Sequence, residues 1–251
     1  MAEPVVVITG ASSGIGEALA VQLTQSGAAV TLVARRREVV QAVCARCGPH
    51  ALAVVADMTR RPDAERVVAE AIARFGHIDV WVNNVGRGIS RPPSELTDED
   101  IDEMMLVNVK SALYGMQAVL PHFKARGTGH VINVSSQLGR VPMALFRSAY
   151  NGAKHFLNAL TANVRDEVAA AHPGIQVSLV SPGAVRTPFG VNALHGGVDS
   201  RGLPNSQSAE EVAAVIAGVI ASRRPDVYTR PGARQMMLDY LGALTEDAPP
   251  G

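Results

Sequence analysis

Residues 5–16 read Val5-Val6-Val7-Ile8-Thr9-Gly10-Ala11-Ser12-Ser13-Gly14-Ile15-Gly16, and this stretch decides the fold of the chain. The apolar run at its start is typical of a strand buried on both faces of a parallel sheet. The glycines that follow let the backbone turn sharply and approach a ligand closely. A helix beginning near Gly14 points its free N–H groups and positive dipole end at the turn, where they stabilise a pyrophosphate. The stretch therefore predicts a strand, a phosphate-binding turn and a helix.

The three glycines of this turn have the spacing G-x-x-x-G-x-G. The spacing differs from the G-x-G-x-x-G dinucleotide fingerprint, and the turn lacks the Gly-Lys-Ser/Thr end of a P-loop. Tight packing between strand and helix is an alternative reason for glycine here. The position of the turn directly after the first strand favours phosphate binding.

The rest of the chain alternates between apolar runs and helical patterns. Strands are expected at 5–8, 29–34, 51–56, 79–82, 130–134, 175–180 and 227–229. Helices are expected from 14, over 62–75, from 97 to about 124, up to about 171 and from 208. This alternation is typical of a parallel sheet covered by helices on both faces. The predicted fold class is α/β, a single doubly wound Rossmann-type domain with about seven strands.

Length and composition bound the domain organisation. The chain has 251 residues, of which 47% are hydrophobic, so it can bury one large core. We expect one dinucleotide-binding and catalytic domain over 1–251. The Gly- and Asn-rich stretch around 187–207 is expected to be a substrate loop or lid, and 245–251 a flexible tail.

Charge and hydropathy argue against several classes of partner. Lys plus Arg and Asp plus Glu number 23 each, so nothing draws the whole surface toward nucleic acid or an anionic membrane. The N-terminus runs into the first strand without the pattern of a signal peptide, and no apolar stretch is long enough to span a bilayer. We therefore expect a cytoplasmic protein.

Cys44 and Cys47 are the only cysteines. A lone C-x-x-C can be redox-active or half of a metal site, but a zinc site needs about four ligands. The sequence offers no second Cys pair and no suitably spaced His pair. We expect two thiols one turn apart on a helix, and no metal.

Three arginines, Arg35-Arg36-Arg37, follow the expected second strand, where the adenosine ribose lies in folds of this class. A carboxylate there would bond the 2′-hydroxyl of NAD, whereas arginine makes bidentate contacts with a phosphate. Arg35 and Arg36 therefore favour NADP(H) over NAD(H). The alternative is that the arginines only solvate the start of the next helix.

Tyr150 and Lys154 are four residues apart, so they share one face of a helix. A nearby ammonium favours the phenolate, so we expect Lys154 to lower the pKa of Tyr150 from about 10 toward the neutral range. Such a group suits proton exchange with a carbonyl or alcohol. Chance also places one Tyr and one Lys in this way on a helix, so the rest of the chain has to decide.

Further polar residues occur where expected strands end or inside an expected helix. Asn83-Asn84-Val85-Gly86 ends the fourth strand with two amides and a glycine, and Ser135 and Ser136 follow the fifth. Asn108 lies inside a helix, where Asn is locally unfavourable. These residues suit a polar site at the carboxyl edge of the sheet, although ordinary turns also explain the asparagines and serines.

These motifs together resemble the short-chain dehydrogenase/reductase family from Thr9 to about Thr187. The family pattern T-G-x-x-x-G-x-G and its N-N-A-G are matched by Thr9, Gly10, Gly14 and Gly16, and by Asn83, Asn84 and Gly86. The P-G turn after the sixth strand matches Pro182-Gly183.

The resemblance also implies site residues. The family's catalytic Asn, Ser, Tyr and Lys fall on Asn108, Ser136, Tyr150 and Lys154. Ser136 is preferred to Ser135 because the family's serine usually has a glycine three residues later, here Gly139. The implied cofactor-binding residues are Gly10, Ser12, Ser13, Gly14, Ile15, Gly16, Arg35, Arg36, Asp57, Met58, Asn84, Val85, Gly86, Tyr150, Lys154, Pro182, Gly183, Val185 and Thr187.

Three departures from the family pattern stand out. Val85 replaces the usual Ala and narrows the expected space near the cofactor. The segment from Ser136 to Tyr150 is one residue longer than is common, which bears on the serine assignment and on the shape of the substrate pocket. Gly152 and Ala153 replace the usual Ala-Ser before the lysine. Glycine inside a helix costs about 1 kcal/mol relative to Ala, so close packing is expected there.

The function implied by the resemblance is hydride transfer between NADP(H) and a ketone, aldehyde or secondary alcohol, with Tyr150 as general acid/base. Ser136 would polarise the carbonyl oxygen, Lys154 would hold the nicotinamide ribose, and Asn108 would hold a water in a proton relay. An NADPH-dependent carbonyl reductase is the expectation. The alternatives are an NAD-linked alcohol dehydrogenase and a non-catalytic regulator that senses NADP(H).

The sequence says less about substrate and assembly. Apolar residues at 138–146 are candidates for a pocket wall, and four arginines are candidates for binding an acidic substrate, although such residues more often pack a loop or solvate the surface. These arginines are Arg87, Arg91, Arg140 and Arg147. The family resemblance implies a homodimer or homotetramer formed through the helices that carry Asn108 and Tyr150.

Overall fold

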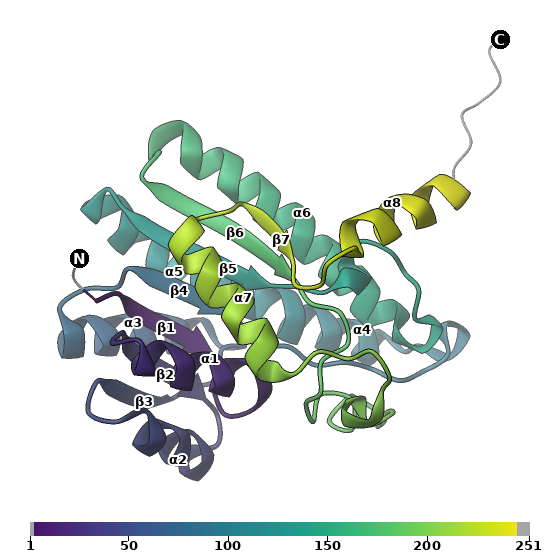
Figure 1. The fold of residues 1–251 in the computed structure, drawn as a ribbon, viewed down its shortest axis with the longest axis horizontal. Helices are drawn as coiled ribbons and strands as arrows, with labels where there is room; N and C mark the ends of the chain where they lie inside the picture. Colours follow the sequence, from purple (N-terminus) through teal and green to yellow (C-terminus); the bar gives the residue numbers. More distant parts are fainter. Residues whose placement is uncertain (1–2, 245–251) are drawn as a thin grey trace.

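Seven parallel strands form one sheet in the order β3-β2-β1-β4-β5-β6-β7 (Figure 1). The structure is a computed structural model and describes residues 3–244. The strands are β1 Val5–Thr9, β2 Ala29–Ala34, β3 Ala51–Val55, β4 Val80–Asn83, β5 Gly129–Val134, β6 Ile175–Ser181 and β7 Asp226–Tyr228. All seven predicted strands are confirmed, with small differences at their ends. The predicted tail 245–251 lies outside the described residues.

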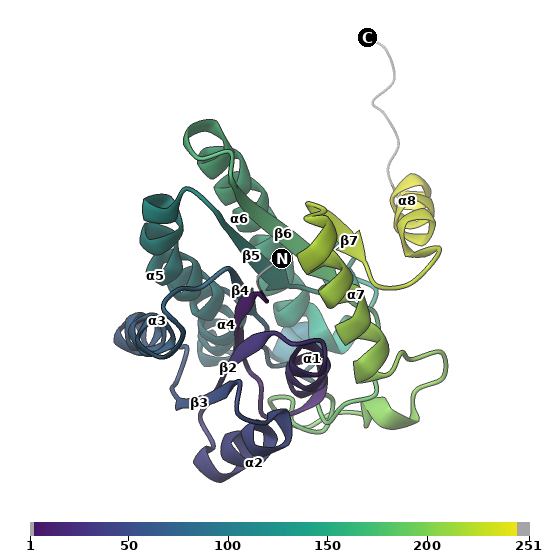
Figure 2. The same cartoon turned by 60° about the vertical axis from the view of Figure 1, so that its left-hand side comes forward.

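Helices cover both faces of the sheet (Figure 2). They are α1 Gly14–Gln25, α2 Arg37–Cys47, α3 Arg61–Phe75, α4 Asp98–Met105, α5 Ser111–Arg126, α6 Ser148–Ala171, α7 Ala209–Ser222 and α8 Ala233–Leu244. Short 3₁₀ helices are η1 Pro93–Glu95, η3 Gln137–Gly139, η4 Leu145–Arg147 and η5 Ser200–Gly202, and η2 Leu106–Lys110 is a π-helix. The predicted Rossmann-type α/β fold is confirmed.

The first strand shows why its apolar run is continuous. Val6 and Ile8 point into a core shared with α1, α2 and α7, whereas Val7 points into a second core shared with α3, α5 and α6. Successive side chains of a strand point to opposite faces, so a strand in the middle of this sheet must be apolar at every position. All five residues of β1 are buried.

Capping boxes begin two of the helices. Thr97 and Asp100 exchange side-chain and backbone hydrogen bonds at the start of α4, and Ser208 and Glu211 do the same for α7. The helix predicted from 97 to about 124 is continuous but not uniform, because the π-helix η2 separates α4 from α5. The wider turn of a π-helix occurs mostly as a single insertion within an α-helix, often at a functional site. Here it contains Asn108.

The sheet order places a crevice next to β1. The chain proceeds from β1 to β2 and β3 in one direction, then returns to β4 and continues to β7 in the other. In open parallel sheets, ligands bind outside the carboxyl ends of the strands at such a reversal. The residues that follow β1 and β4 therefore flank a natural binding crevice.

The C-terminal part adds one element that the sequence did not predict. Helix α8 lies beyond β7 at the edge of the sheet (Figures 1 and 2), with only Ala233 and Met237 buried. Cys44 and Cys47 lie one turn apart on α2, as predicted, and are free thiols. No cluster of three or more His, Cys, Asp or Glu side chains is placed to hold a metal ion among residues 3–244. Within the same residues, no helix has the length and apolar character needed to cross a membrane.

Candidate active site

A cleft of about 880 Å³ opens at the carboxyl ends of the central strands. Its walls are the segments that follow β1, β2, β3, β4, β5 and β6, together with residues of α6 and of the loop before α7. The cleft therefore occupies the crevice that the sheet order creates. Every cofactor-binding residue predicted from the sequence lines it, except Gly16.

The glycine turn forms one end of the cleft. Gly10 and Gly14 have φ angles of +68° and +60°, which L-residues with a side chain adopt at a cost. A Cβ on Gly16 would lie 2.5 Å from the carbonyl oxygen of Gly10 and 2.7 Å from Asn84 Nδ2. The first two glycines thus shape the turn, and Gly16 lets α1 pack against it.

The N-terminus of α1 is open toward the cleft. Ser13 is the N-cap, yet its side chain makes no capping hydrogen bond. The first N–H groups of a helix have no partner within the helix, so they are available to an anion. Since Ser12, Ser13 and Ile15 all line the cleft here, the turn fits a pyrophosphate.

Asn84 fastens the glycine turn to the end of β4. Its Nδ2 donates hydrogen bonds to the carbonyl oxygens of Thr9 (3.2 Å) and Gly10 (3.1 Å), and its N–H donates to Thr9 Oγ1 (3.0 Å). The following Val85 is half-buried and packs into the core, while Gly86 lies on the cleft surface. The Asn84 amide therefore acts within the protein and shapes the cleft.

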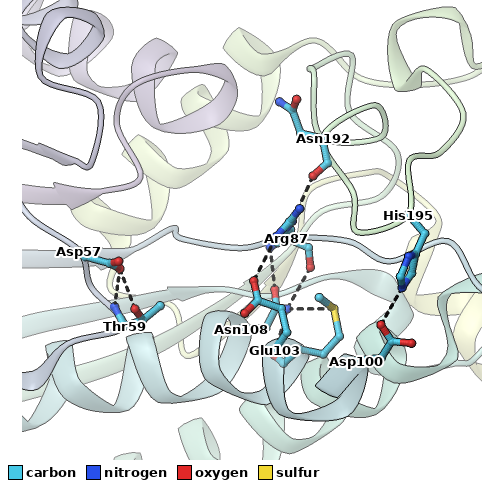
Figure 3. A network of polar contacts seen from close by, with 9 residues as sticks. Asp57, Thr59, Arg87, Asp100, Glu103, Asn108, Asn192 and His195 are labelled. Carbon is cyan, nitrogen blue, oxygen red and sulfur yellow. Dashed lines mark hydrogen bonds and ion pairs between the residues drawn. The ribbon is translucent and has the colours of Figure 1, made fainter. Parts of the chain in front are cut away.

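Arg35 and Arg36 lie at the carboxyl end of β2, where the sequence analysis expected them. Both are exposed and line the cleft, and Arg36 Nη2 lies 3.4 Å from Ser12 Oγ. Neither guanidinium has a carboxylate partner among the described residues. Nearby, Asp57 Oδ1 accepts hydrogen bonds from Thr59 N–H (3.0 Å) and Oγ1 (2.8 Å) (Figure 3). The Arg35 and Arg36 side chains are therefore available to bind an anionic group at this end of the cleft.

The prediction for the pKa of Tyr150 is wrong in direction. Tyr150 is only 6% exposed, and burial raises the pKa of its phenol above the ordinary value. A hydrogen bond with the Ser136 side chain and the charge of Arg147 act in the opposite direction but are weaker. The Lys154 Nζ atom lies 5.7 Å from the Tyr150 ring centroid, as the spacing predicted, yet desolvation outweighs the effect of any nearby cation.

Lys154 is buried with no carboxylate partner among the described residues. Its Nζ donates a hydrogen bond to the carbonyl oxygen of Val134 (3.0 Å), and the side chain is 3% exposed. Burial without a counter-ion lowers the pKa of Lys154 to about 8. The ammonium is therefore charged at neutral pH but close to titrating.

The two serines after β5 have different partners, which supports the choice of Ser136. The Ser135 hydroxyl donates to Asn158 Oδ1 inside the protein. The Ser136 hydroxyl lines the cleft, interacts with Tyr150 and accepts a hydrogen bond from Leu138 N–H (3.1 Å). The 3₁₀ helix η3 therefore holds Ser136 beside the phenol.

Asn108 is fully buried behind the cleft surface. Its Nδ2 donates to the carbonyl oxygens of Arg87 (2.9 Å) and Met104 (3.1 Å), and its Oδ1 accepts from Arg87 N–H (3.1 Å) (Figure 3). A Cβ on Gly86 would lie 3.2 Å from Asn108 Oδ1 and 3.7 Å from Lys154 Nζ. Asn108 thus fixes the backbone at Gly86 and Arg87, while the predicted water relay stays a prediction.

The turn after β6 closes the opposite side of the cleft. Pro182, Gly183, Val185 and Thr187 line it, as predicted. A Cβ on Gly14 would lie 2.9 Å from Thr187 Cγ2. The turns after β1 and β6 thus meet at the start of α1.

Comparison with known proteins identifies the family. A family model described as short chain dehydrogenase matches residues 4–195, which is more than half of the chain. This chain belongs to the short-chain dehydrogenase family. It is accordingly an oxidoreductase of that family.

Relatives and solved structures agree with this assignment. An uncharacterized oxidoreductase of Staphylococcus epidermidis is 37% identical over 187 residues, which are 74% of this dehydrogenase and 80% of that protein. A 3-ketoacyl-(acyl-carrier-protein) reductase from Brucella melitensis, complexed with NADH, has 28% identity and a TM-score of 0.80 over 90% of this chain and 97% of its own. An alcohol dehydrogenase from the archaeon Thermococcus sibiricus, complexed with 5-hydroxy-NADP, has 26% identity and a TM-score of 0.75. The match covers 90% of this chain and 95% of that protein.

The middle of the segment predicted as a substrate loop or lid, 187–207, is held by contacts with the segment after β4, and its role stays a prediction. Leu194 pairs with the segment after β4 through hydrogen bonds to Gly88 (2.8 Å) and Ser90 (3.0 Å). Arg87 Nε donates to the carbonyl oxygen of Asn192 (3.3 Å), as Figure 3 shows. These partners are about 100 residues away along the chain, and no local pattern predicts their pairing.

A buried carboxylate makes a second fastening. Asp100 is only 3% exposed, and its carboxylate lies 2.7 Å from His195 Nε2 (Figure 3) and 2.9 Å from Arg91 Nη1. The hydrogen bond from His195 is the largest of the effects that lower the pKa of Asp100, which falls to about 2. Since Thr97 and Asp100 look like an ordinary capping box, sequence reasoning missed the second role of this residue.

The candidate arginines of the substrate end differ in their partners. Arg87 pairs with Glu103 (3.1 Å), Arg91 with Asp100, and Arg140 with Asp226. Arg147 has no carboxylate partner among the described residues and lies on the cleft wall. The sequence does not distinguish these four arginines, and only the fold shows which of them has a carboxylate partner.

Proposed function

We propose that this dehydrogenase reduces a ketone or aldehyde with NADPH, in one catalytic domain, with Tyr150 as the proton donor. The observation that carries the proposal is the convergence of the Tyr150 phenol, the Ser136 hydroxyl and the Lys154 ammonium on the cleft that starts at the glycine turn. These three groups stand where the carboxyl ends of β5 and β6 face α6.

The cleft fits a nicotinamide dinucleotide phosphate. The glycine turn and the open N-terminus of α1 would hold the pyrophosphate, and Arg35 and Arg36 would hold the 2′-phosphate beside Ser12. Lys154 would hold the nicotinamide ribose. When bound, the cofactor supplies the hydride that the carbonyl carbon receives.

The protonation state of Tyr150 favours the reductive direction. Because burial raises its pKa, the phenol keeps its proton at neutral pH and can donate it to the carbonyl oxygen. Ser136 would hydrogen-bond to the same oxygen, and a donor aimed at developing negative charge stabilises a transition state by about 3–4 kcal/mol. The Lys154 ammonium stabilises the buried phenolate that remains after proton transfer.

The remaining family residue has a positioning role in this proposal. Asn108 makes two hydrogen bonds to the backbone of Arg87 and a third to the carbonyl oxygen of Met104, and Gly86 lies between Asn108 and Lys154. An Asp in its place would lose both N–H donors of the amide. Asn108 therefore keeps the floor of the cleft at a fixed distance from Lys154.

Replacing Tyr150 by Phe tests the proposal. The variant keeps the ring but loses the acid, and general acid catalysis contributes about 100- to 10,000-fold, so kcat/KM for carbonyl reduction should fall by at least about 100-fold. NADPH binding, followed by fluorescence, should be unchanged. Tyr114→Phe, on a helix remote from the cleft, is the matched control. Equal turnover by Tyr150→Phe and wild type would show that the assignment is wrong, and a protein that binds NADPH but reduces no carbonyl would instead be a regulator.

The preference for NADP(H) has its own test. KM for NADPH should lie well below KM for NADH. Arg36→Ala should raise the KM for NADPH by about tenfold and leave the KM for NADH nearly unchanged. A strong preference of the wild type for NADH would instead support an NAD-linked dehydrogenase, as in the solved relative that holds NADH.

We also propose that the protein is a homodimer or homotetramer that packs through α6 and the helix that carries Asn108, which runs from α4 through η2 to α5. A shallow apolar surface where α4 meets α6, lined by Leu96, Ile101, Met105 and Gly152, supports this proposal. Light scattering that detects only monomer would contradict it.

A further inference from the structure

We infer that the substrate of this dehydrogenase is an oxo acid, a carbonyl compound whose anionic group pairs with Arg147. The inference rests on the proposed carbonyl reduction and names the class of substrate. It starts from the unequal environments of the four arginines that the sequence singled out, of which Arg87 and Arg147 line the cleft. Three of them have a carboxylate partner, and Arg147 has none among residues 3–244.

Arg147 is held in place although it lacks an ion-pair partner. Its guanidinium carbon lies 5.7 Å from the ring centroid of Phe189. A Cβ on Gly88 would lie 2.5 Å from Arg147 Nη1 and 3.0 Å from Phe189 Cε1, so the absence of a side chain at this position makes room for both groups. A planar guanidinium that rests on an aromatic face keeps its edge N–H groups free for a bidentate contact.

The same aromatic ring connects Arg147 to the proton donor. Phe189 packs edge-to-face on Tyr150 with ring centroids 5.6 Å apart, and all three residues line the cleft. The charge of Arg147 is also close enough to favour the Tyr150 phenolate. An anion bound by Arg147 therefore lies near the carbonyl that Tyr150 would protonate.

Part of this end is apolar, since Leu138, Met143, Pro188, Phe189 and Leu203 line it, and Met143 is 44% exposed. The polar residues of the same lining include Arg87, Glu103, Asn192, Ser200 and Arg230. Arg36, which we assign to the cofactor, lies beside Ser12 at the far end of the cleft. An acid with a hydrocarbon chain complements both the cation and this wall, whereas a neutral polar substrate leaves the guanidinium without a partner.

Matched pairs of substrates test the inference. We would measure kcat/KM with NADPH for straight-chain oxo acids whose carbonyl lies one to four carbons from the carboxylate, and for their ethyl esters. At the best chain length the acid should exceed its ester by at least about 30-fold, mainly through KM, because a site built to pair with a charged group rejects an analogue that lacks it. Phosphonate analogues of the same chains distinguish a carboxylate from a phosphate as the preferred anion.

Three variants assign the preference to Arg147. Arg147→Met keeps the length of the side chain without its charge and should bring the acid-to-ester ratio close to one. Any effect of this charge on Tyr150 acts on both substrates alike and cancels in the ratio. Arg147→Lys should give an intermediate ratio because the point charge remains without the bidentate fork. Arg140→Met removes a cation that already pairs with Asp226, and the ratio should stay at the wild-type value. An acid preference that survives in Arg147→Met would overturn the inference.

A binding measurement keeps this result separate from the proposed reaction. Saturated carboxylic acids of the same lengths cannot be reduced, so calorimetry reports their binding without turnover. Wild type should bind the acid at least about tenfold more tightly than the matching amide, and Arg147→Met should bind both equally. If this difference is found while no carbonyl is reduced, the proposed reaction fails and the anion site stands. Equal binding of acid and amide by wild type would contradict the anion site alone.

Discussion

The cofactor end of the cleft is made of strand termini and glycine turns, whereas its substrate end is made of two loops. At the first end, Asn84 bonds to the backbone of Thr9 and Gly10, and Gly16 packs on the turn itself. The Asn84 side chain holds these backbone groups, and the sheet fixes their positions. This end therefore has little room for substitution.

The substrate end is held by contacts between segments far apart in the sequence. The loop 187–207 is fastened by Arg87 and by the Asp100–His195 pair, and the loop before α6 exposes Met143, Leu145 and Phe146. These three side chains of the loop before α6 are therefore open to solvent. The difference shows that the sheet fixes one end of the cleft, whereas side-chain contacts between loops fix the other.

Substitution of Gly16 should have the largest effect. In Gly16→Ala the new Cβ meets backbone atoms of Gly10 and Ala11 that cannot move away without deforming the turn. We expect NADPH to bind about 100-fold more weakly, measured by fluorescence titration, with circular dichroism to verify folding. Gly218→Ala, at a helical position where a Cβ meets nothing within 4 Å, is the control. Normal binding by Gly16→Ala would show that the cofactor end is less constrained than its packing indicates.

The titration of Lys154, where the two ends meet, should give the next largest effect. Its pKa of about 8 means that the ammonium is present below pH 8 and is lost as pH rises through that value. The kcat/KM for NADPH, which reports the free enzyme, should be constant from about pH 6 to 7.5 and then fall by up to tenfold per pH unit. Circular dichroism over the same range detects unfolding. A flat profile to pH 9.5 would mean that the charge of Lys154 does not contribute.

Asp100→Asn should affect the substrate end alone. The pKa of Asp100 is lowered, so its carboxylate stabilises the fold above the unfolded value of about 3.9, and this contribution is lost as pH falls toward 2. At neutral pH the substitution removes the charge that pairs with Arg91 and His195. We expect faster hydrogen exchange over 187–207 and a three- to tenfold rise in the substrate KM, with NADPH binding unchanged. Asp98→Asn, in the same first turn but away from the loop, is the control. Equal hydrogen exchange over 187–207 in the two variants would show that Asp100 does not hold the loop.

Gly152→Ala should have the smallest effect. We expected close packing at this glycine, but a Cβ there would meet nothing within 4 Å among the described residues, so that expectation is wrong for the isolated chain. Alanine should stabilise α6 by up to about 1 kcal/mol and raise the melting temperature by about 2–4 °C. A fall in melting temperature would indicate that a second copy packs on this face of α6.

The sequence by itself determined the fold and the cofactor end. The buried strand β1 needs apolar residues on both faces, and the turn after it needs glycine where φ is positive, so both leave a local signature. The spacing of Tyr150 and Lys154 and the glycine after Ser136 likewise identified side chains that the fold brings together. In each case the physical requirement falls on residues that are adjacent or one helical turn apart.

Tertiary structure alone decided the protonation of the site and the partners of its charges. Tyr150 and Lys154 face each other as predicted, yet burial shifts both pKa values, and burial is a property of the whole fold. The four arginines of the substrate end look alike in the sequence. Their partners Glu103, Asp100 and Asp226 lie between 9 and 86 residues away from them along the chain. Arg147 is distinguished only because the fold brings it no carboxylate, and contacts across such separations leave no local pattern from which to predict them.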